Sequence, residues 1–401
     1  MENIGVVVLA TLVVAYGFLS KRLSKTAFTG PILFMAFGLV AGPPTLDWLR
    51  PDTAVRLVSL VLEATLVLVL FTDAFNIDLG KLRTAIRLPG RLLAIGFPLM
   101  VLLGWAAAVW LFPELGWLGA LLVAVLLAPT DAALGVAVIS NPRVPVHIRN
   151  ALNIESGLND GLALPLFFVV LGAASAPEGA GWSGGVLEAV VFQVVVASLI
   201  GIAVGAGAAR LGVAAVERGW AEAAWVQIAL VAVALVAWGL ADGLGASGFI
   251  AAWVAGLSCG IVARARLDRP VEFSETLGRG LTLVVFTIFG ASALAPNISD
   301  FDGRIIVYAV LSLGVIRMIS VVIATAGTGL DAATKGFLGW FGPRGLASII
   351  LVLIVLEEGE VPGTPLIADL MVATVAVSVL LHGATAWWGS NRYADRVASG
   401  S

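Results

Sequence analysis

Long apolar runs follow one another along almost the whole of this chain of 401 residues. A run of about 20 apolar residues is long enough to cross the hydrocarbon core of a bilayer as an α-helix. The composition agrees, because 60% of the residues are hydrophobic and 12% are charged, whereas about 25% are charged in soluble domains. An outer-membrane barrel would need short strands of alternating polarity instead. The sequence therefore predicts an all-α polytopic membrane protein.

The apolar runs predict about thirteen transmembrane helices. They lie near residues 3–20, 26–42, 55–73, 91–112, 117–140, 147–173, 187–214, 221–241, 246–262, 279–295, 303–327, 333–357 and 364–388. The connections between them are short, so we expect no soluble regulatory domain. The first run lacks a preceding basic region and a small-residue cleavage site, and we interpret it as a retained span, not a signal peptide.

Basic residues are unevenly distributed over the loops between these spans. If the N-terminus lies outside, the outside loops hold only three basic residues, which are Arg50, Arg56 and Arg304. This bias satisfies the positive-inside rule. The odd number of spans then puts the C-terminus in the cytoplasm. We expect the protein to lie in the cell (inner) membrane. The net charge is −3 and there is no basic tract, so we expect the lipid bilayer, and no nucleic acid, as a partner.

Two of the predicted spans are interrupted. The fifth breaks at residues 128–131, where Pro129 lacks an N–H group and its ring clashes with the carbonyl one turn earlier. The twelfth breaks at residues 341–345, where two glycines flank a proline and an arginine. If spans 1–6 and 8–13 form two halves joined by span 7, both breaks occupy the fifth position of a half. Paired interrupted helices in inverted repeats indicate a transporter binding site.

Polar residues in the sixth span form one stripe. Glu155 and Asn159 are four residues apart, and so are Ser156 and Asp160, so these pairs share a helix face. Such a stripe cannot face lipid without a cost of several kcal/mol. An acid at this depth is a functional hypothesis by default. We expect the stripe to face the break of the fifth span, where Asp131 lies.

The chemistry of this region favours an alkali cation. The carboxylate of Asp131, the hydroxyl of Thr130 and the carbonyls freed at the break are hard oxygen ligands, which suit such an ion better than a transition metal. No histidine lies in the stripe, and Cys259 is the single cysteine of the chain. The sequence therefore predicts no zinc, iron or cysteine-bound cofactor and favours a monovalent cation as the bound species.

Two arginines are predicted to lie inside the membrane. Arg317 is in the eleventh span and Arg344 is at the second break. A buried charge needs a partner, and Glu155 is the natural partner for Arg317, while Arg344 would neutralise the half-helix ends at its own break. Glu63 in the third span and His147 at the entrance to the sixth receive no assigned role.

These residues resemble the monovalent cation:proton antiporter-1 family, of the NhaP and sodium/proton-exchanger type. The matching motifs are Thr130-Asp131, Glu155-Ser156-Gly157-Leu158-Asn159-Asp160-Gly161, Arg317 and Gly342-Pro343-Arg344-Gly345. With about thirteen spans in the same arrangement, the resemblance covers essentially the whole chain. It implies an antiporter that is not an enzyme, with the NhaA-like fold of inverted repeats and two interrupted crossing helices.

The resemblance also implies a homodimer and a division into domains. Residues 1–90 and 219–300 would form the dimerisation domain, residues 91–176 and 301–401 the mobile core, and residues 177–218 the linker helix. In the cation and proton site, the resemblance makes Asp160 the main carrier of a sodium ion or a proton. The site would be completed by Asp131, Thr130 and Ser156 and supported by Asn159, Glu155, Arg317 and Arg344.

The mobile core that the resemblance implies would give alternating access of elevator type, and the sequence predicts that the exchange is electroneutral. Asp160 is neutralised by either a cation or a proton, and Asn159 cannot titrate, so one cation replaces one proton. A solute symporter on the same fold would need a roomy polar cavity, and a channel would need rings of repeated pore residues. Coupled flux in vesicles separates these alternatives, which include a non-transporting scaffold. The choice among Na⁺, Li⁺ and K⁺ depends on oxygen placement at sub-ångström scale, which the sequence does not give.

Overall fold

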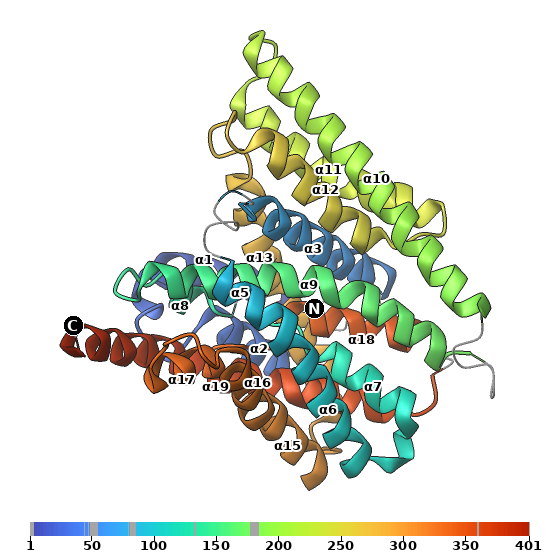
Figure 1. The fold of residues 1–401 in the computed structure, drawn as a ribbon, viewed down its shortest axis with the longest axis vertical. Helices are drawn as coiled ribbons and strands as arrows, with labels where there is room; N and C mark the ends of the chain where they lie inside the picture. The colour runs from blue at the N-terminus through green and yellow to red at the C-terminus, as the bar shows by residue number, and fades with distance from the viewer. Residues whose placement is uncertain are drawn as a thin grey trace. The chain divides into compact units, whose positions relative to one another are not determined.

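The fold is known from a computed structural model that describes residues 4–43, 45–46, 48, 55–78, 80, 86–131, 134–176, 184–358 and 361–400 (Figure 1). Within these residues all regular structure is helical. Eight helices there are long and apolar enough to cross a membrane, and four shorter apolar helices accompany them. The chain is thus an all-α polytopic membrane protein, as predicted. Arg50, used above for the orientation, lies outside the described residues.

The helices follow the apolar runs. In the first half they are α1 (Ile4–Leu23), α2 (Gly30–Ala41), α3 (Val55–Asn76), α5 (Arg87–Arg91), the π-helix η2 (Leu92–Gly96), α6 (Phe97–Leu111), the 3₁₀ turn η3 (Pro113–Leu115), α7 (Gly116–Leu126), α8 (Val136–Ile139), α9 (Val146–Ala174) and α10 (Gly184–Glu217). In the second half they are α11 (Ala223–Gly243), α12 (Gly248–Ala263), α13 (Glu272–Ile288), the π-helix η4 (Phe289–Leu294), α14 (Ala295–Asn297), α15 (Gly303–Val310), the π-helix η5 (Leu311–Ile316), α16 (Arg317–Ala324), α17 (Ala332–Trp340), α18 (Leu346–Glu358) and α19 (Thr364–Gly400).

Both predicted interruptions are present. The fifth span divides into α7 and the four-residue helix α8, and the twelfth divides into α17 and α18. Helix α7 ends at Leu126. The amide of Leu127 still donates to the carbonyl of Val123, but Pro129 two residues later has no N–H group to donate. Phe341 ends α17 with a backbone conformation outside the helical region.

Two features of the helices differ from the sequence prediction. The last apolar run ends near residue 388, but α19 continues to Gly400, because the polar residues that follow still form helix and need not enter the membrane. In addition, three spans in the part of the chain that the structure describes contain a turn of π-helix, and Arg317 directly follows one of them. Such π-bulges are frequent at functional sites, and hydropathy does not report them.

The contacts divide the chain into two compact units. The first comprises the described residues of Met1–Leu60, Arg87–Ser156 and Thr282–Ser401, and the second those of Val61–Ile86 and Gly157–Leu281. In the second unit, α10, α11 and α12 pack against one another (Figure 1). In the first unit, both α8 and α17 pack against α19. The dimerisation and core domains described above concern relative movement, which contacts do not test, so they stay a prediction.

A hydrophobic cluster surrounds the short helices α8 and α17 in the first unit. Its buried members are Leu92, Val138, Val144, Ile148, Leu152, Val321, Ala324, Phe337, Leu338, Phe341, Ala386 and Tyr393. Tyr393 comes from the polar extension of α19, stacks on Phe337 with ring centroids 4.1 Å apart and exchanges a hydrogen bond with Thr334. The extension of α19 therefore anchors the helix that leads into the second break.

Candidate functional site: two crossed helix breaks

The two breaks complete each other's backbone hydrogen bonds. The amide of Asp131 in the first break donates to the carbonyl of Pro343 in the second, with N and O 2.8 Å apart. In return, the amide of Leu346, the first residue of α18, donates to the Asp131 carboxylate at 2.6 Å. The N-terminus of a helix favours a negative charge, so Asp131 caps α18 from a different segment of the chain.

A hydroxyl makes a second link between the breaks. Ser348 in α18 donates its hydroxyl proton to the carbonyl of Leu126 at 2.8 Å. That carbonyl belongs to the last residue of α7, where helix carbonyls lose their normal partners. Both half-helix ends therefore receive a side-chain partner from the opposite break.

The second break needs glycine at Gly345. A Cβ atom there would lie 2.0 Å from Oδ2 of Asp131 and 2.8 Å from Cδ1 of Leu134. The first distance is far below van der Waals contact, so any side chain would displace the Asp131 carboxylate. The close approach of Asp131 thus explains why the second glycine of the Gly-Pro-Arg-Gly motif, Gly345, has no side chain.

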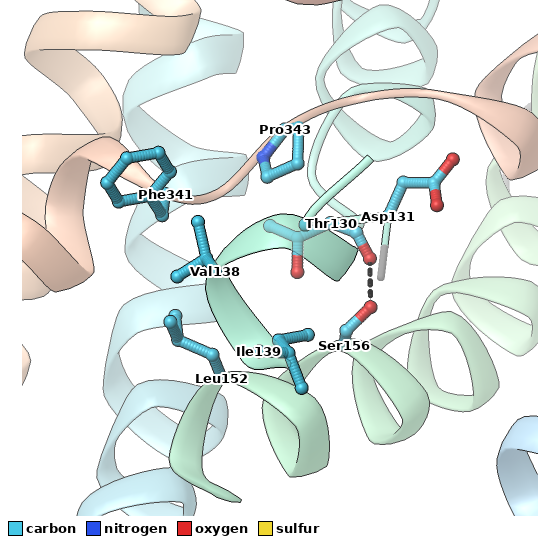
Figure 2. Close-up of a pocket in the computed structure, with 9 residues that line it drawn as sticks. Thr130, Asp131, Val138, Ile139, Leu152, Ser156, Phe341 and Pro343 are labelled. Carbon is cyan, nitrogen blue, oxygen red and sulfur yellow. Dashed lines mark hydrogen bonds between the residues drawn. The ribbon is translucent and has the colours of Figure 1, made fainter. Parts of the chain in front are cut away.

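Ser156 connects α9 to the first break. Its hydroxyl donates to the Thr130 carbonyl with the two oxygens 2.6 Å apart, as Figure 2 shows. The face of α9 that bears Ser156 is therefore turned toward the break, as predicted from the polar stripe.

A small pocket lies where these segments meet. It leaves about 10 Å³ for the centre of a water-sized sphere, and it is lined by Thr130, Asp131, Gly135, Val138, Ile139, Leu152, Ser156, Phe341 and Pro343. In Figure 2 the apolar side chains of Phe341, Val138 and Leu152 gather on one side, and the carboxylate of Asp131 and the hydroxyl of Ser156 lie on the other. The pocket thus has an oxygen-rich wall and an apolar wall.

Glu155 and Arg317 form a buried, two-pronged ion pair. Nη1 of Arg317 lies 2.5 Å from Oε1 of Glu155, and Nη2 lies 2.9 Å from Oε2. Both residues are almost completely inaccessible, with 1% and 0% of their surface exposed. The guanidinium also reaches the carbonyl of Leu338 in α17 at 3.4 Å. The ion pair predicted from the sequence is present, and it ties α9 to α16 and α17.

Arg344 brings a second buried cation close to this pair. Its Nη1 donates to the Gly342 carbonyl at 2.7 Å, so it neutralises a carbonyl of its own break. Arg344 and Arg317 each place a guanidinium nitrogen 3.5 Å from the sulfur of Met100. Glu155 interacts electrostatically with Arg344 as well as with Arg317. One carboxylate therefore lies among two guanidinium groups.

Asn159 and Asp160 lie one helical turn beyond Glu155 and Ser156. Both are buried, with 0% and 8% of their surface exposed. They belong to the second compact unit, which begins again at Gly157, but α9 itself continues without interruption from Val146 to Ala174. Their direction relative to Ser156 is therefore given by helix geometry, which puts Asp160 on the same face.

Sequence reasoning missed Met100, Ser348 and Ser378. The two serines bond to backbone atoms of a break, Ser348 as described and Ser378 by accepting the Arg344 amide at 2.7 Å. Their signal was a hydroxyl inside an apolar run. Such hydroxyls usually bond to their own helix, as Thr374 does to the Leu370 carbonyl, so the signal alone does not identify a site. His147 is exposed in the first turn of α9, and no role emerges for it or for Glu63.

The family model "Sodium/hydrogen exchanger, transmembrane" matches residues 7–388. The K⁺/H⁺ antiporter NhaP of Alkalimonas amylolytica is 25% identical over 391 residues, which are 96% of this chain and 66% of that protein. The chain thus spans just under two thirds of this relative's length.

Two further comparisons extend this result. The Na⁺/H⁺ antiporter NhaP of Pseudomonas aeruginosa is 28% identical over 332 residues, which are 78% of this chain and 76% of that protein. The solved structure of the sodium proton antiporter MjNhaP1 from Methanocaldococcus jannaschii at pH 8 superposes with a TM-score of 0.75. It is 21% identical and covers 94% of this chain and 98% of its own. This structure has the same fold as the present chain.

Proposed function

This chain belongs to the sodium/hydrogen exchanger family of transporters, and we propose that it exchanges a monovalent cation for a proton across a membrane. One structural observation supports the proposal most directly. The two helix breaks cross at Asp131, whose carboxylate accepts the Leu346 amide, and the Ser156 hydroxyl bonds to the neighbouring Thr130 carbonyl. Broken helices inside a membrane are tolerated where they are buried in protein or line a cavity. Here they surround a pocket whose polar wall consists of oxygen atoms.

The proposed cation ligands are oxygens of Asp160, Asp131, Thr130 and Ser156. Carboxylate, hydroxyl and carbonyl oxygens suit a partly dehydrated Na⁺, Li⁺ or K⁺ ion. Asp160 is the proposed carrier, because it lies one turn from Ser156 on the same face of α9 and is buried. A bare carboxylate is costly in a buried site, so Asp160 would hold either the cation or a proton while the transporter reorients.

The other charged groups are proposed to keep their charge through the cycle. The Asp131 carboxylate accepts the first amide of α18, and a helix N-terminus stabilises the ionised form. Glu155 is held by two hydrogen bonds from Arg317. Asn159 supports the site and cannot titrate. One cation would then replace one proton, and the exchange would be electroneutral.

Several broader features belong to the same proposal. We expect a homodimer in a cell (inner) membrane, with the N-terminus outside and the C-terminus in the cytoplasm. Residues 91–176 and 301–401 would move as the core of an elevator against residues 1–90 and 219–300, joined by the linker helix of residues 177–218. Both helix breaks lie within the residues of the proposed core, so they would move with it.

A solute symporter on the same fold is the second candidate. Pockets for organic ligands usually have volumes of about 300–1,000 Å³. The pocket at the break leaves about 10 Å³ for the centre of a water-sized sphere, and one of its walls is apolar; that is about the space of one water molecule. This size favours a single small ion with few water molecules. A channel or a non-transporting scaffold would show uncoupled conductance or no flux.

Proteoliposomes test the proposal. A pH gradient is imposed, Na⁺, K⁺ or Li⁺ is added outside, and the pH inside is followed at several starting pH values. We expect saturable dissipation of the gradient by at least one of these cations, and none with Asp160→Asn, which should still fold. Retained coupled exchange in Asp160→Asn would refute the assignment of the carrier, and conductance without coupling would refute antiport.

The same vesicles test electroneutrality. A membrane potential of about 100 mV is worth about 2.3 kcal/mol for each net charge moved. If one proton is exchanged for one cation, imposing this potential or clamping it at zero with an ionophore leaves the exchange equilibrium unchanged. A shift of the endpoint with potential, or a net current during turnover, would show that a second proton travels and that the argument from Asn159 is wrong.

A further inference from the structure

A buried serine and histidine of α19 contact the second break. The Ser378 hydroxyl oxygen accepts a hydrogen bond from the backbone amide of Arg344 with N and O 2.7 Å apart. One turn later in α19, Nδ1 of His382 lies 3.1 Å from the same hydroxyl. Ser378 and His382 are 0% and 1% exposed. The proposed ion-binding chemistry gives these two residues no role.

The Arg344 amide is half of one peptide group. The other half is the Pro343 carbonyl, which accepts the amide of Asp131 at 2.8 Å. A peptide group is planar and rigid. Ser378 therefore holds the N–H end of the Pro343–Arg344 peptide group, and the backbone amide of Asp131 is bonded to its carbonyl end. A rotation of this peptide group would therefore displace the backbone of Asp131.

The Ser378 hydroxyl differs from neighbouring hydroxyls on its helix. Thr374 and Thr385 each donate to the carbonyl four residues earlier, which is the usual bond of a hydroxyl in a helix. The Ser378 hydroxyl oxygen instead accepts a hydrogen bond from the Arg344 amide of the break. Nδ1 of His382 lies 3.1 Å from both the hydroxyl oxygen and the backbone carbonyl oxygen of Ser378. A carbonyl oxygen can only accept, so Nδ1 carries the ring proton and donates it to these two oxygens. The His382 ring is 5.4 Å from the ring of Trp340, the last residue of α17, so its orientation is restricted.

We propose that Ser378 and His382 are positioning residues of the cation site. His382 orients the Ser378 hydroxyl, the hydroxyl fixes the Pro343–Arg344 peptide group, and this group sets the backbone of Asp131. The inference rests on the proposed function for its effect on transport, but the geometry of the break can be tested without transport.

Transport kinetics give the first test. Ser378→Ala removes only the hydroxyl, and the matched control Thr374→Val removes a buried hydroxyl of α19 that does not contact the break. We expect Ser378→Ala to raise the apparent KM for the cation about tenfold, the effect of leaving one buried amide unpaired, with the maximal rate within about twofold of wild type. Thr374→Val should leave both values unchanged. An unchanged KM in folded Ser378→Ala would overturn the proposal.

The role of His382 is tested by two variants. His382→Phe keeps a ring of similar size without the Nδ1–H donor, and His382→Asn places an amide NH₂ donor near the position of Nδ1. We expect His382→Phe to raise KM and His382→Asn to retain a value near that of wild type. Because both residues act in one chain of bonds, Ser378→Ala combined with His382→Phe should raise KM no further than Ser378→Ala alone. Multiplicative effects of the two substitutions, or equal KM values for the two His382 variants, would contradict the chain.

Amide hydrogen exchange separates this inference from the proposed function. The peptide containing Arg344 should exchange about tenfold faster in Ser378→Ala than in wild type or Thr374→Val, whether or not the protein transports cations. If wild-type vesicles show no cation-driven proton exchange but the Arg344 amide is deprotected, the proposed function fails and the positioning role stands. Unchanged protection in Ser378→Ala would overturn the positioning role even if the wild type is an active antiporter.

Discussion

In the ion pair of Glu155 and Arg317, loss of the glutamate charge should destabilise the protein more than loss of the arginine charge. Removal of one member of a buried ion pair costs about 3–5 kcal/mol, because the other charge stays buried without compensation. Glu155→Gln leaves two buried guanidinium groups, those of Arg317 and Arg344, without the carboxylate that lies among them. Arg317→Met leaves Glu155 with its interaction with Arg344. We therefore expect the loss for Glu155→Gln at the upper end of the range and that for Arg317→Met at the lower end.

The double variant measures the coupling. Glu155→Gln with Arg317→Met removes both charges, so its loss should be smaller than the sum of the single losses by at least about 2 kcal/mol. The assay is equilibrium unfolding in mixed detergent micelles, followed by the fluorescence of the chain's 12 tryptophans. Ser320→Ala is the matched partner for a control cycle, because Ser320 is equally buried on α16 and bonds to the Ile316 carbonyl of its own helix.

Two results would refute this reasoning. Strict additivity of the Glu155→Gln and Arg317→Met losses would show that the close contact contributes no coupling. A larger loss for Arg317→Met than for Glu155→Gln would show that Arg344 does not share the carboxylate. The control cycle of Glu155→Gln with Ser320→Ala should be additive, which confirms that the assay itself does not generate apparent coupling.

Two further predictions concern the breaks and the entry to α17. Gly345→Ala should reduce cation-driven exchange more than tenfold, because its Cβ would lie 2.0 Å from the Asp131 carboxylate, whereas Gly336→Ala, whose Cβ meets nothing within 4 Å, should leave exchange unchanged; equal activities would contradict the close approach. Asp331 is the N-cap of α17, and its carboxylate accepts a hydrogen bond from the Thr334 amide. The side-chain and backbone hydrogen bonds of Thr334 hold the pKa of Asp331 below its usual value of 3.8. The N-cap therefore stabilises the folded protein above pH 3.8, and this stabilisation is lost as the pH falls through the lower pKa of the folded state. Asp331→Ala should therefore lower the unfolding midpoint at pH 7, and the difference from wild type should narrow below pH 3.8; a difference that grows on acidification would contradict the cap.

The fold was largely predictable because membrane insertion leaves few options for the backbone. Apolar runs of sufficient length form helices, and a proline inside such a run removes a hydrogen bond, so the positions of both breaks followed from residues 128–131 and 341–345. The pair of Glu155 and Arg317 was predictable for a similar reason, since each buried charge requires an opposite one. The three turns of π-helix were not predictable, because they change the hydrogen-bond ladder without changing hydropathy.

The details of the site depend on contacts between distant segments. The sequence indicated that Asp131 lies at a helix break, but not that it caps α18, which begins 215 positions later. It also gave no means to separate Ser378, which bonds to the second break, from Thr374, which bonds to its own helix. Such choices depend on the sideways placement of helices, which the pattern of apolar and polar residues along one chain does not encode.

The hydrogen bonds between the two breaks join segments that are synthesised at very different times. The first break leaves the ribosome long before α17 and α18 exist, yet its Asp131 amide bonds to the Pro343 carbonyl and its Leu126 carbonyl bonds to Ser348. Lipid offers no substitute for these partners. Nascent α7 and α8 therefore lack these partners until residues 343–348, in roughly the last seventh of the chain, have been made. The crossing of the two breaks can therefore be completed only late in synthesis, although one of the two breaks is made early.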